Sequence, residues 1–144
     1  MKYKRTEDLL EQLKKQNIKY DDYLAKNEDS FVVQDLSEYW REVIEKSNMT
    51  KVDIINKADI GYTYFYNVIG GKSIPSRDTL VKLFLSMRAG LEECQKALKL
   101  YNWSGLYPKN KRDSILIYAL AHSLSLYDTE EILEDKGEKI FRTS

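Results

Sequence analysis

The amino-acid sequence predicts an all-α protein. Hydrophobic residues recur at helical spacing along most of the chain, and its only two prolines fall in segments rich in turn residues. Residues with good N-capping side chains precede most of the periodic segments. With 144 residues, the chain is long enough for one domain with a substantial core, or for one domain with an appendage.

Residues 1–34 are expected to form an N-terminal helical arm. Thr6 can cap a helix from Glu7 to Gln16, and a second short helix is expected from Asp21 to Lys26. The apolar stripe of the first helix consists of Leu9, Leu10 and Leu13. Phe31, Val32 and Val33 form the one run with β character. Because this run is only three residues long, we interpret it as a buried connector rather than a strand.

Residues 35–101 are expected to form five helices, of which the first begins after Asp35. Asp35 and Glu38 stand at the spacing of an N-cap and its third helical residue, and this helix should end near Ser47. Its inward stripe consists of Leu36, Tyr39, Trp40, Val43 and Ile44. Thr50 and Asp53 repeat the capping pattern for a helix over Lys51–Ala58.

A tight turn should follow this second helix of the block. The residues from Ala58 to Gly61 are too few for anything but a turn, so a third helix is expected over Tyr62–Ile69. Gly70 and Gly71 then stop it, because glycine adopts a left-handed C-cap without steric strain. Two short helices joined by a tight turn form a unit whose second helix can lie in the DNA major groove.

The fourth and fifth helices of the block follow a loop that contains Pro75. Ser76 can cap the fourth helix, which runs to Arg88, and Gly90 separates it from the fifth over Leu91–Tyr101. The inward side chains of the fourth helix are Leu80, Leu83, Phe84 and Met87. Cys94 lies on the apolar stripe of the fifth helix, and we expect it to be a small buried hydrophobic residue.

Residues 102–144 are expected to form a C-terminal two-helix appendage. Asn110 can cap a helix to His122, and Ser125 can cap a last helix that ends near Asp135. Trp103 lies in the preceding loop, and we expect it to fasten the appendage to the five-helix block.

Composition argues against an enzyme. With one histidine and one cysteine there is no plausible Cys–His or multi-histidine metal constellation, so we expect no metal and no cofactor. The Gly70–Ser73 string lacks the first glycine and the preceding strand of a phosphate-binding loop. No segment is apolar over the ~20 residues of a membrane span, and no signal peptide is evident. We therefore expect a cytoplasmic protein without a membrane partner.

Charge is unevenly distributed along the chain. The whole sequence balances 23 basic against 23 acidic residues, whereas the segment from Met49 to Ala89 carries six Lys or Arg against three Asp. The central helices are therefore the only net positive block. A local excess of this size is weak evidence for a nucleic-acid partner, since a solvated surface often carries one.

The central segment resembles the Cro/phage-repressor (XRE-like) helix-turn-helix family. The matching residues are Ala58, Ile60, Tyr64, Gly71, Lys72, Pro75, Ser76, Thr79 and Leu80, and Phe65 and Val68 agree in apolar character. The resemblance implies a lambda-repressor-like five-helix domain over residues 35–101. It also implies a sequence-specific, double-stranded-DNA-binding transcriptional regulator of bacterial or phage type, with the helix near residues 62–69 in the major groove.

The resemblance implies a set of DNA contacts. Base contacts would come from Tyr62, Thr63, Tyr66 and Asn67, and phosphate contacts from Thr50, Lys51, Lys72, Ser73 and Arg77. The sequence departs from the family at two positions. Asp59 replaces the usual glycine of the turn, a conformation that Asp tolerates, and Ile55 replaces the usual small residue of the first helix.

Two questions about partners stay open at the level of sequence. Such domains usually read two half-sites as a homodimer, and the dimer contact could come from Leu9, Leu10 and Leu13 or from Ile132 and Leu133. Tyr62 and Tyr66 lie one helical turn apart, so they could instead bind a partner protein. The alternative function is then a protein–protein adaptor on a helix-turn-helix fold.

Overall fold

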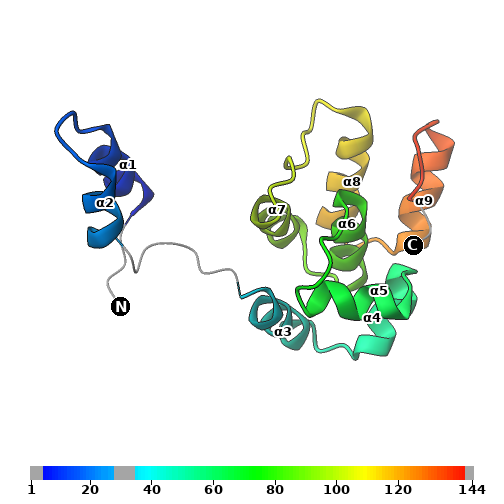
Figure 1. The fold of residues 1–144 in the computed structure, drawn as a ribbon. Helices are drawn as coiled ribbons and strands as arrows, with labels where there is room; N and C mark the ends of the chain where they lie inside the picture. The colour runs from blue at the N-terminus through cyan, green and yellow to red at the C-terminus, as the bar shows by residue number, and fades with distance from the viewer. Residues whose placement is uncertain (1–4, 28–34, 142–144) are drawn as a thin grey trace. The chain divides into compact units, whose positions relative to one another are not determined.

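All secondary structure in the described part of the protein is helical (Figure 1). The structure is a computed structural model that describes residues 5–27 and 35–141, and it contains no strand in those ranges. Its helices are α1 (Thr6–Lys14), α2 (Tyr20–Lys26), α3 (Leu36–Ser47), α4 (Lys51–Ala58), α5 (Tyr62–Ile69), α6 (Arg77–Ser86), α7 (Leu91–Leu100), α8 (Lys111–Ala121) and α9 (Leu126–Asp135). The all-α prediction is confirmed. The expected connector at Phe31–Val33 lies outside the described residues.

The chain divides into two compact units. The N-terminal unit extends to Gln34 and contains α1 and α2, and the C-terminal unit begins at Asp35 and contains the other helices. No helix in the described ranges has both the length and the apolar character needed to cross a membrane.

The N-terminal unit is a pair of short helices held together by Asn27. The Asn27 side-chain amide, which is buried, donates to Gln12 Oε1 at 2.7 Å and to the Tyr23 carbonyl at 3.0 Å. Helix α1 itself contains no buried residue. The predicted Thr6 cap is wrong, since Arg5 is the N-cap and contributes no side-chain hydrogen bond. Thr6 is therefore the first residue of α1 rather than its N-cap.

The C-terminal unit begins its helices with side-chain caps. In five helices the cap side chain accepts a hydrogen bond from the third helical N–H, which is one of the donors that has no partner inside a helix. The capping residues are Asp35, Thr50, Ser76, Asn110 and Ser125, and all five were predicted.

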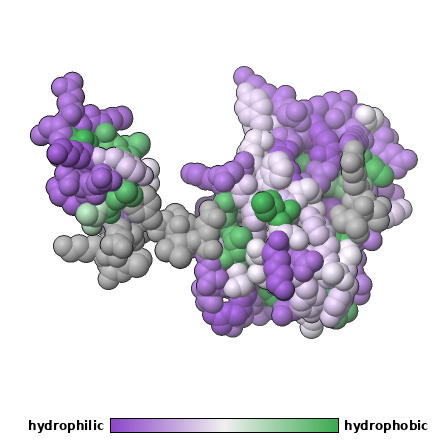
Figure 2. Space-filling model, viewed as in Figure 1, coloured by the Kyte–Doolittle hydropathy of each residue, from purple (hydrophilic) through white to green (hydrophobic). Residues whose placement is uncertain are grey.

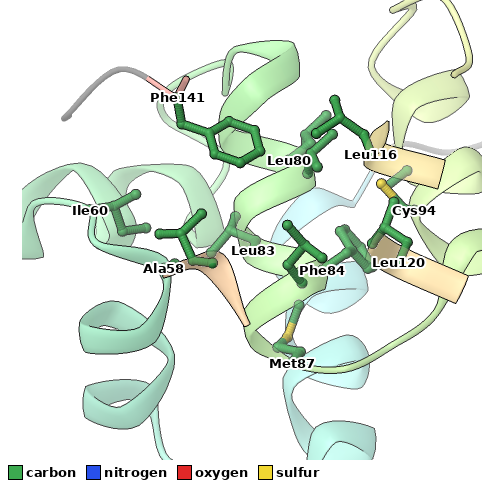
Figure 3. Close-up of a cluster of buried hydrophobic side chains, with 14 of the residues drawn as sticks. Ala58, Ile60, Leu80, Leu83, Phe84, Met87, Cys94, Leu116, Leu120 and Phe141 are labelled. Carbon is green, nitrogen blue, oxygen red and sulfur yellow. The ribbon is translucent and has the colours of Figure 1, made fainter. Parts of the chain in front are cut away.

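Helix α6 lies at the centre of the C-terminal unit. It packs against α4, α7, α8 and α9, and every residue from Thr79 to Ser86 is buried. Figure 3 shows its apolar side chains in one cluster with Ala58, Cys94 and Phe141. A helix that is buried all round must be apolar on every face or must satisfy its polar groups internally. Its sequence predicts only one inward face, so α6 is more deeply enclosed than expected.

Lys82 is the polar residue that this enclosure most affects. The side chain is only 2% exposed, and its Nζ donates to the Asp59 carbonyl at 3.3 Å. Burial lowers the pKa of the Lys82 ammonium, whereas the charges of Asp59, Glu130 and Asp78 raise it. Burial likewise raises the pKa of Glu130 on α9. Lys82 thus links the central helix to the turn between α4 and α5.

The last forty residues of the described chain share the core of the C-terminal unit. Leu116 and Leu133 are completely buried, and Trp103 Nε1 donates to the Pro75 carbonyl at 3.0 Å. The expected fastening role of Trp103 is confirmed. Arg112 makes a bidentate pair with Asp78, with distances of 2.9 and 3.1 Å, and so joins the first turns of α6 and α8.

Cys94 and Trp40 are core residues, as predicted. Cys94 is fully buried, and burial raises the pKa of its thiol to about 12, so the thiolate that reacts with oxidants is scarce at neutral pH. Trp40 on α3 donates through Nε1 to the Tyr101 hydroxyl at 2.7 Å. This bond ties α3 to the end of α7.

Candidate nucleic-acid interface

The turn between α4 and α5 sets the direction in which α5 leaves the core. Asp59 adopts the left-handed conformation, with φ 52° and ψ 54°, at the position where the family has glycine. The Asp59 N–H donates to the Asn56 carbonyl, and the Ile60 N–H to the Ile55 carbonyl. Ile55 is buried, so the core accommodates its extra bulk. These hydrogen bonds, together with the one from Lys82 Nζ to the Asp59 carbonyl, give the turn a defined geometry.

Helix α5 has a buried back and an open front. Phe65 and Val68 anchor the back in the core, whereas Tyr62 is 63% exposed and Thr63 is also exposed at the start of the helix. Asn67 is half-buried one turn further on. The N-cap, Gly61, contributes no side chain, so the first-turn N–H groups of α5 stay available for a ligand.

Tyr62 and Tyr66 form one aromatic surface on the open front. Their ring centroids lie 4.7 Å apart at an interplanar angle of 45°, and Lys51 Nζ lies 5.6 Å from the centroid of the Tyr66 ring. The hydrogen bond with Tyr66 raises the pKa of the Tyr62 hydroxyl, and the nearby Lys51 charge opposes this shift. Four of the predicted residues, the two tyrosines, Thr63 and Lys51, therefore lie together or adjoin along this surface.

The loop after α5 carries the next predicted contacts. The Asn67 carbonyl accepts hydrogen bonds from the Lys72 N–H at 2.8 Å and from the Ser73 N–H at 3.1 Å. These bonds need the left-handed Gly71, whose φ is 79°. The Lys72 side chain is exposed, so the loop holds a positive charge close to the C-terminal end of α5.

Arg77 has a different role from the one predicted. Its guanidinium forms a bidentate pair with Asp113, with both distances 2.9 Å, and also donates to the carbonyls of Ser104 and Gly105. Its side chain is only 23% exposed. A guanidinium with its donors engaged in this way has little left for a phosphate. Arg77 therefore joins the C-terminal helices to α6 and leaves the proposed DNA-contact set.

Asp113 completes this junction from α8. Its carboxylate also accepts a hydrogen bond from the Tyr107 N–H at 3.1 Å. Burial by itself raises the pKa of Asp113, but the hydrogen bonds from Arg77 and Tyr107 and the nearby arginine charges lower it by more. The pKa of Asp113 consequently lies below its ordinary value of 3.8.

Fewer positive charges are available at the candidate interface than the sequence suggested. Of the basic residues between Met49 and Ala89, Arg77 is paired and Lys82 is buried. Lys51 and Lys72 are the exposed cations that flank α5. On the face seen in Figure 2, hydrophilic residues predominate over the C-terminal unit and hydrophobic residues form small separate patches.

Comparisons with protein-family models, curated proteins and solved structures found no match. The candidate interface therefore depends on its own geometry and on the resemblance of the Ala58–Leu80 run. Among the residues that the structure describes, no three or more His, Cys, Asp or Glu side chains gather to hold a metal ion.

Sequence reasoning missed two residues that support this interface. Lys82 was not recognised because a lysine within a helical stripe is ordinarily solvent-exposed. Asp113 lies three residues after the Asn110 cap, and nothing local connects it with Arg77, which is 36 residues away. Only tertiary contacts reveal that Lys82 binds the turn at Asp59 and that Asp113 pairs with Arg77.

Proposed function

We propose that this protein is a cytoplasmic, sequence-specific DNA-binding transcriptional regulator that inserts α5 into the major groove. The observation that carries the proposal is the open front of α5. Tyr62 and Thr63 are exposed there while Phe65 anchors the opposite face, and Lys51 and Lys72 flank it. A helix presented in this way can place short side chains on base edges while the flanking cations meet phosphates.

The Cro/phage-repressor arrangement of residues 35–101 belongs to the same proposal. It is supported by the order and lengths of α3 to α7, by the left-handed Asp59 in the turn, and by the left-handed Gly71 after α5. In that arrangement α4 lies across the DNA backbone and α5 reads the groove.

Base readout is assigned to Tyr62, Thr63, Tyr66 and Asn67. Asn67 can make a bidentate contact with adenine, and the Thr63 methyl can pack on a thymine methyl. Tyr62 and Tyr66 offer ring surface to a thymine methyl or hydroxyl groups to a phosphate. Phosphate contacts are assigned to Thr50, Lys51, Lys72 and Ser73, together with the N-terminal N–H groups of α4.

Salt dependence of binding to random duplex DNA tests the proposal. Lys51 and Lys72 in each copy can release counterions, so the association constant should fall as salt rises, with a slope of about −0.9 per phosphate neutralised. The measurement is a fluorescence-anisotropy titration from low to moderate salt. Absence of duplex binding at the lowest salt would refute the proposed function.

Two alanine variants separate base readout from phosphate contact. Asn67→Ala should relax the preference at one base pair, with a loss of ~1–3 kcal/mol for the preferred base only. Lys72→Ala should weaken binding to all sequences alike and make the salt slope shallower by about one. Sites selected from a random DNA pool supply the sequences for both titrations. A sequence-selective loss in Lys72→Ala would contradict the assignment of Lys72.

The contacting rings of Tyr62 and Tyr66 favour one alternative function, a protein–protein adaptor. Tyr66 also borders a groove of about 550 Å³ between α3 and α5, where Ile44 and Ile69 supply apolar surface. A tyrosine that borders an apolar groove is typical of binding hot spots. An adaptor would keep the fold yet show no salt-dependent affinity for duplex DNA, so the titration above distinguishes the two.

A further inference from the structure

Positive charge is concentrated in the residues that lead from α7 into α8. Residues 94–112 contain five basic and no acidic side chains, namely Lys96, Lys99, Lys109, Lys111 and Arg112. The acidic residues of the chain after Ala89 lie on either side of this run. Residues 90–144 are therefore close to neutral in total but contain a basic segment, and such a segment attracts a polyanion.

Two of these five cations remain available for a ligand. The other three, Lys96, Lys111 and Arg112, have acidic partners. Lys99 and Lys109 are exposed, and neither forms an ion pair within the described ranges. Lys109 belongs to the segment of residues 101–110 between α7 and α8, which we call the α7–α8 loop (Figure 1).

The α7–α8 loop lies directly against the loop that follows α5. Arg77 donates to two carbonyls of the α7–α8 loop, at 3.0 and 2.8 Å, and Trp103 Nε1 donates to the Pro75 carbonyl at 3.0 Å. Pro75 follows Lys72 by three residues. Arg77 was itself expected to contact a phosphate, so the α7–α8 loop lies where that contact was expected.

The backbone of the α7–α8 loop is fixed from the inside. Gln95 of α7 donates to the Leu106 carbonyl at 3.0 Å and accepts a hydrogen bond from the Leu106 N–H at 2.7 Å. Leu106 is buried, whereas every other residue from Asn102 to Asn110 is exposed. A loop held in this way presents its outer side chains at a small cost in conformational entropy on binding.

The outer side chains of the loop are suited to a nucleic-acid backbone. Tyr107 is 56% exposed, so its hydroxyl can donate to a phosphate oxygen, and Lys109 can pair with the phosphate charge. Trp103 on the same loop is 39% exposed, and Ile74 beside Pro75 is 76% exposed. Apolar side chains of this kind also suit a protein partner. The basic segment and the adjoining Lys72 favour a polyanion instead.

We propose that the α7–α8 loop is a second contact with the DNA backbone, in which Tyr107 and Lys109 bind phosphates next to those assigned to Lys72 and Ser73. This inference rests on the proposed function. The loop adds affinity that does not depend on sequence and leaves base readout to α5. Duplex DNA bound in this way covers Trp103.

Acrylamide quenching of tryptophan fluorescence in the full chain tests whether DNA covers the loop. The chain has two tryptophans, and Trp40 is 1% exposed whereas Trp103 is 39% exposed, so this neutral quencher reports on Trp103. Duplex DNA at saturating concentration should remove most of the quenching. Unchanged quenching while anisotropy shows that the duplex is bound would overturn the proposal and leave the proposed function intact.

Lys109→Ala tests the phosphate contact directly. The variant should bind every duplex sequence about three- to tenfold more weakly, and the salt slope should become shallower by about one. Lys96→Ala is the matched control, because it removes the same charge from the same basic segment at a side chain already paired with Glu92 and Glu93. This control should keep the native salt slope.

Tyr107→Phe removes only the hydroxyl, because the bond of Tyr107 to Asp113 comes from its backbone N–H. Affinity for the duplex should fall while the salt slope stays native, since a neutral donor releases no counterion. Both Tyr107 and Lys109 are exposed, so these variants should unfold thermally as the native chain does.

Three further results would overturn the proposal. A native salt slope in Lys109→Ala would remove the loop from the DNA contact while α5 still binds. Quenching of Trp103 that falls with rising chain concentration in the absence of DNA would assign the loop to a contact between proteins. A native chain that binds no duplex at the lowest salt would refute the proposed function and the role of the loop together.

Discussion

A chain that ends at Tyr101 should lose cooperative thermal unfolding. The truncation removes α8 and α9, which cover two sides of α6. It also removes Leu116, Leu120, Leu133 and Phe141, which are all buried. Each such side chain contributes about 1.5–3 kcal/mol of burial, so together they approach or exceed the ~5–15 kcal/mol by which a domain is stable. Circular dichroism during heating measures the effect.

A chain that begins at Asp35 is the matched control for this truncation. It removes 34 residues from the other end, yet leaves every helix of the C-terminal unit in place. Its thermal transition should stay sharp and close to that of the full chain. A cooperative transition in the chain that ends at Tyr101 would contradict the prediction, because α8 and α9 would then be an addition to a complete domain.

Asp113→Ala should lower the free energy of unfolding by about 2–4 kcal/mol. The substitution leaves the Arg77 guanidinium without its bidentate partner and the Tyr107 N–H without its acceptor. Breaking a buried pair costs about 3–5 kcal/mol, and the partial exposure of Arg77 reduces this. Urea denaturation followed by circular dichroism gives the value.

Arg41→Ala provides the comparison for Asp113→Ala. Arg41 pairs with Glu38 on the surface of α3, and both side chains are largely exposed. Exposed pairs contribute between zero and about 1 kcal/mol, so this variant should unfold almost as the native chain does. Equal losses in the two variants would show that the Arg77–Asp113 pair contributes no more than a surface contact.

The same pair makes stability depend on pH in the acid range. The pKa of Asp113 is lower in the folded protein than its ordinary value of 3.8, which is expected when the chain is unfolded. The unfolded chain therefore binds the proton more readily, and the pair's contribution is complete above that ordinary value. It is lost as the pH falls through the folded pKa. Asp113→Ala should accordingly unfold with a weaker acid dependence than the native chain.

Local signals in the sequence were sufficient to predict where the helices begin and end. A cap depends on residues three apart, so Asp35, Thr50 and Ser76 could be identified without any tertiary information. The left-handed Asp59 was also predictable, because only three residues separate α4 from α5. Predicted helix ends agree with the observed ends to within about two residues, which is the usual uncertainty of a helix boundary.

Contacts between distant segments could not be predicted from the sequence. Arg77 looked like a phosphate contact because its position follows α5, and its pairing with Asp113 depends on how α8 folds back onto α6. The burial of Lys82 depends in the same way on α9 covering the last open side of α6. Of the four α5 residues expected to be exposed, Tyr62 and Thr63 are exposed, whereas Tyr66 and Asn67 are half-buried. The tilted contact between the Tyr62 and Tyr66 rings could be seen only from side-chain geometry.

The complete enclosure of α6 has a consequence for how this protein can change over evolutionary time. Tyr62 and Thr63 of α5 are exposed, so a change of either side chain leaves the core intact. A residue from Thr79 to Ser86 meets other helices on every side, and interiors tolerate only changes that preserve volume. Homologues that bind different targets should therefore share the α6 segment more closely than the α5 segment.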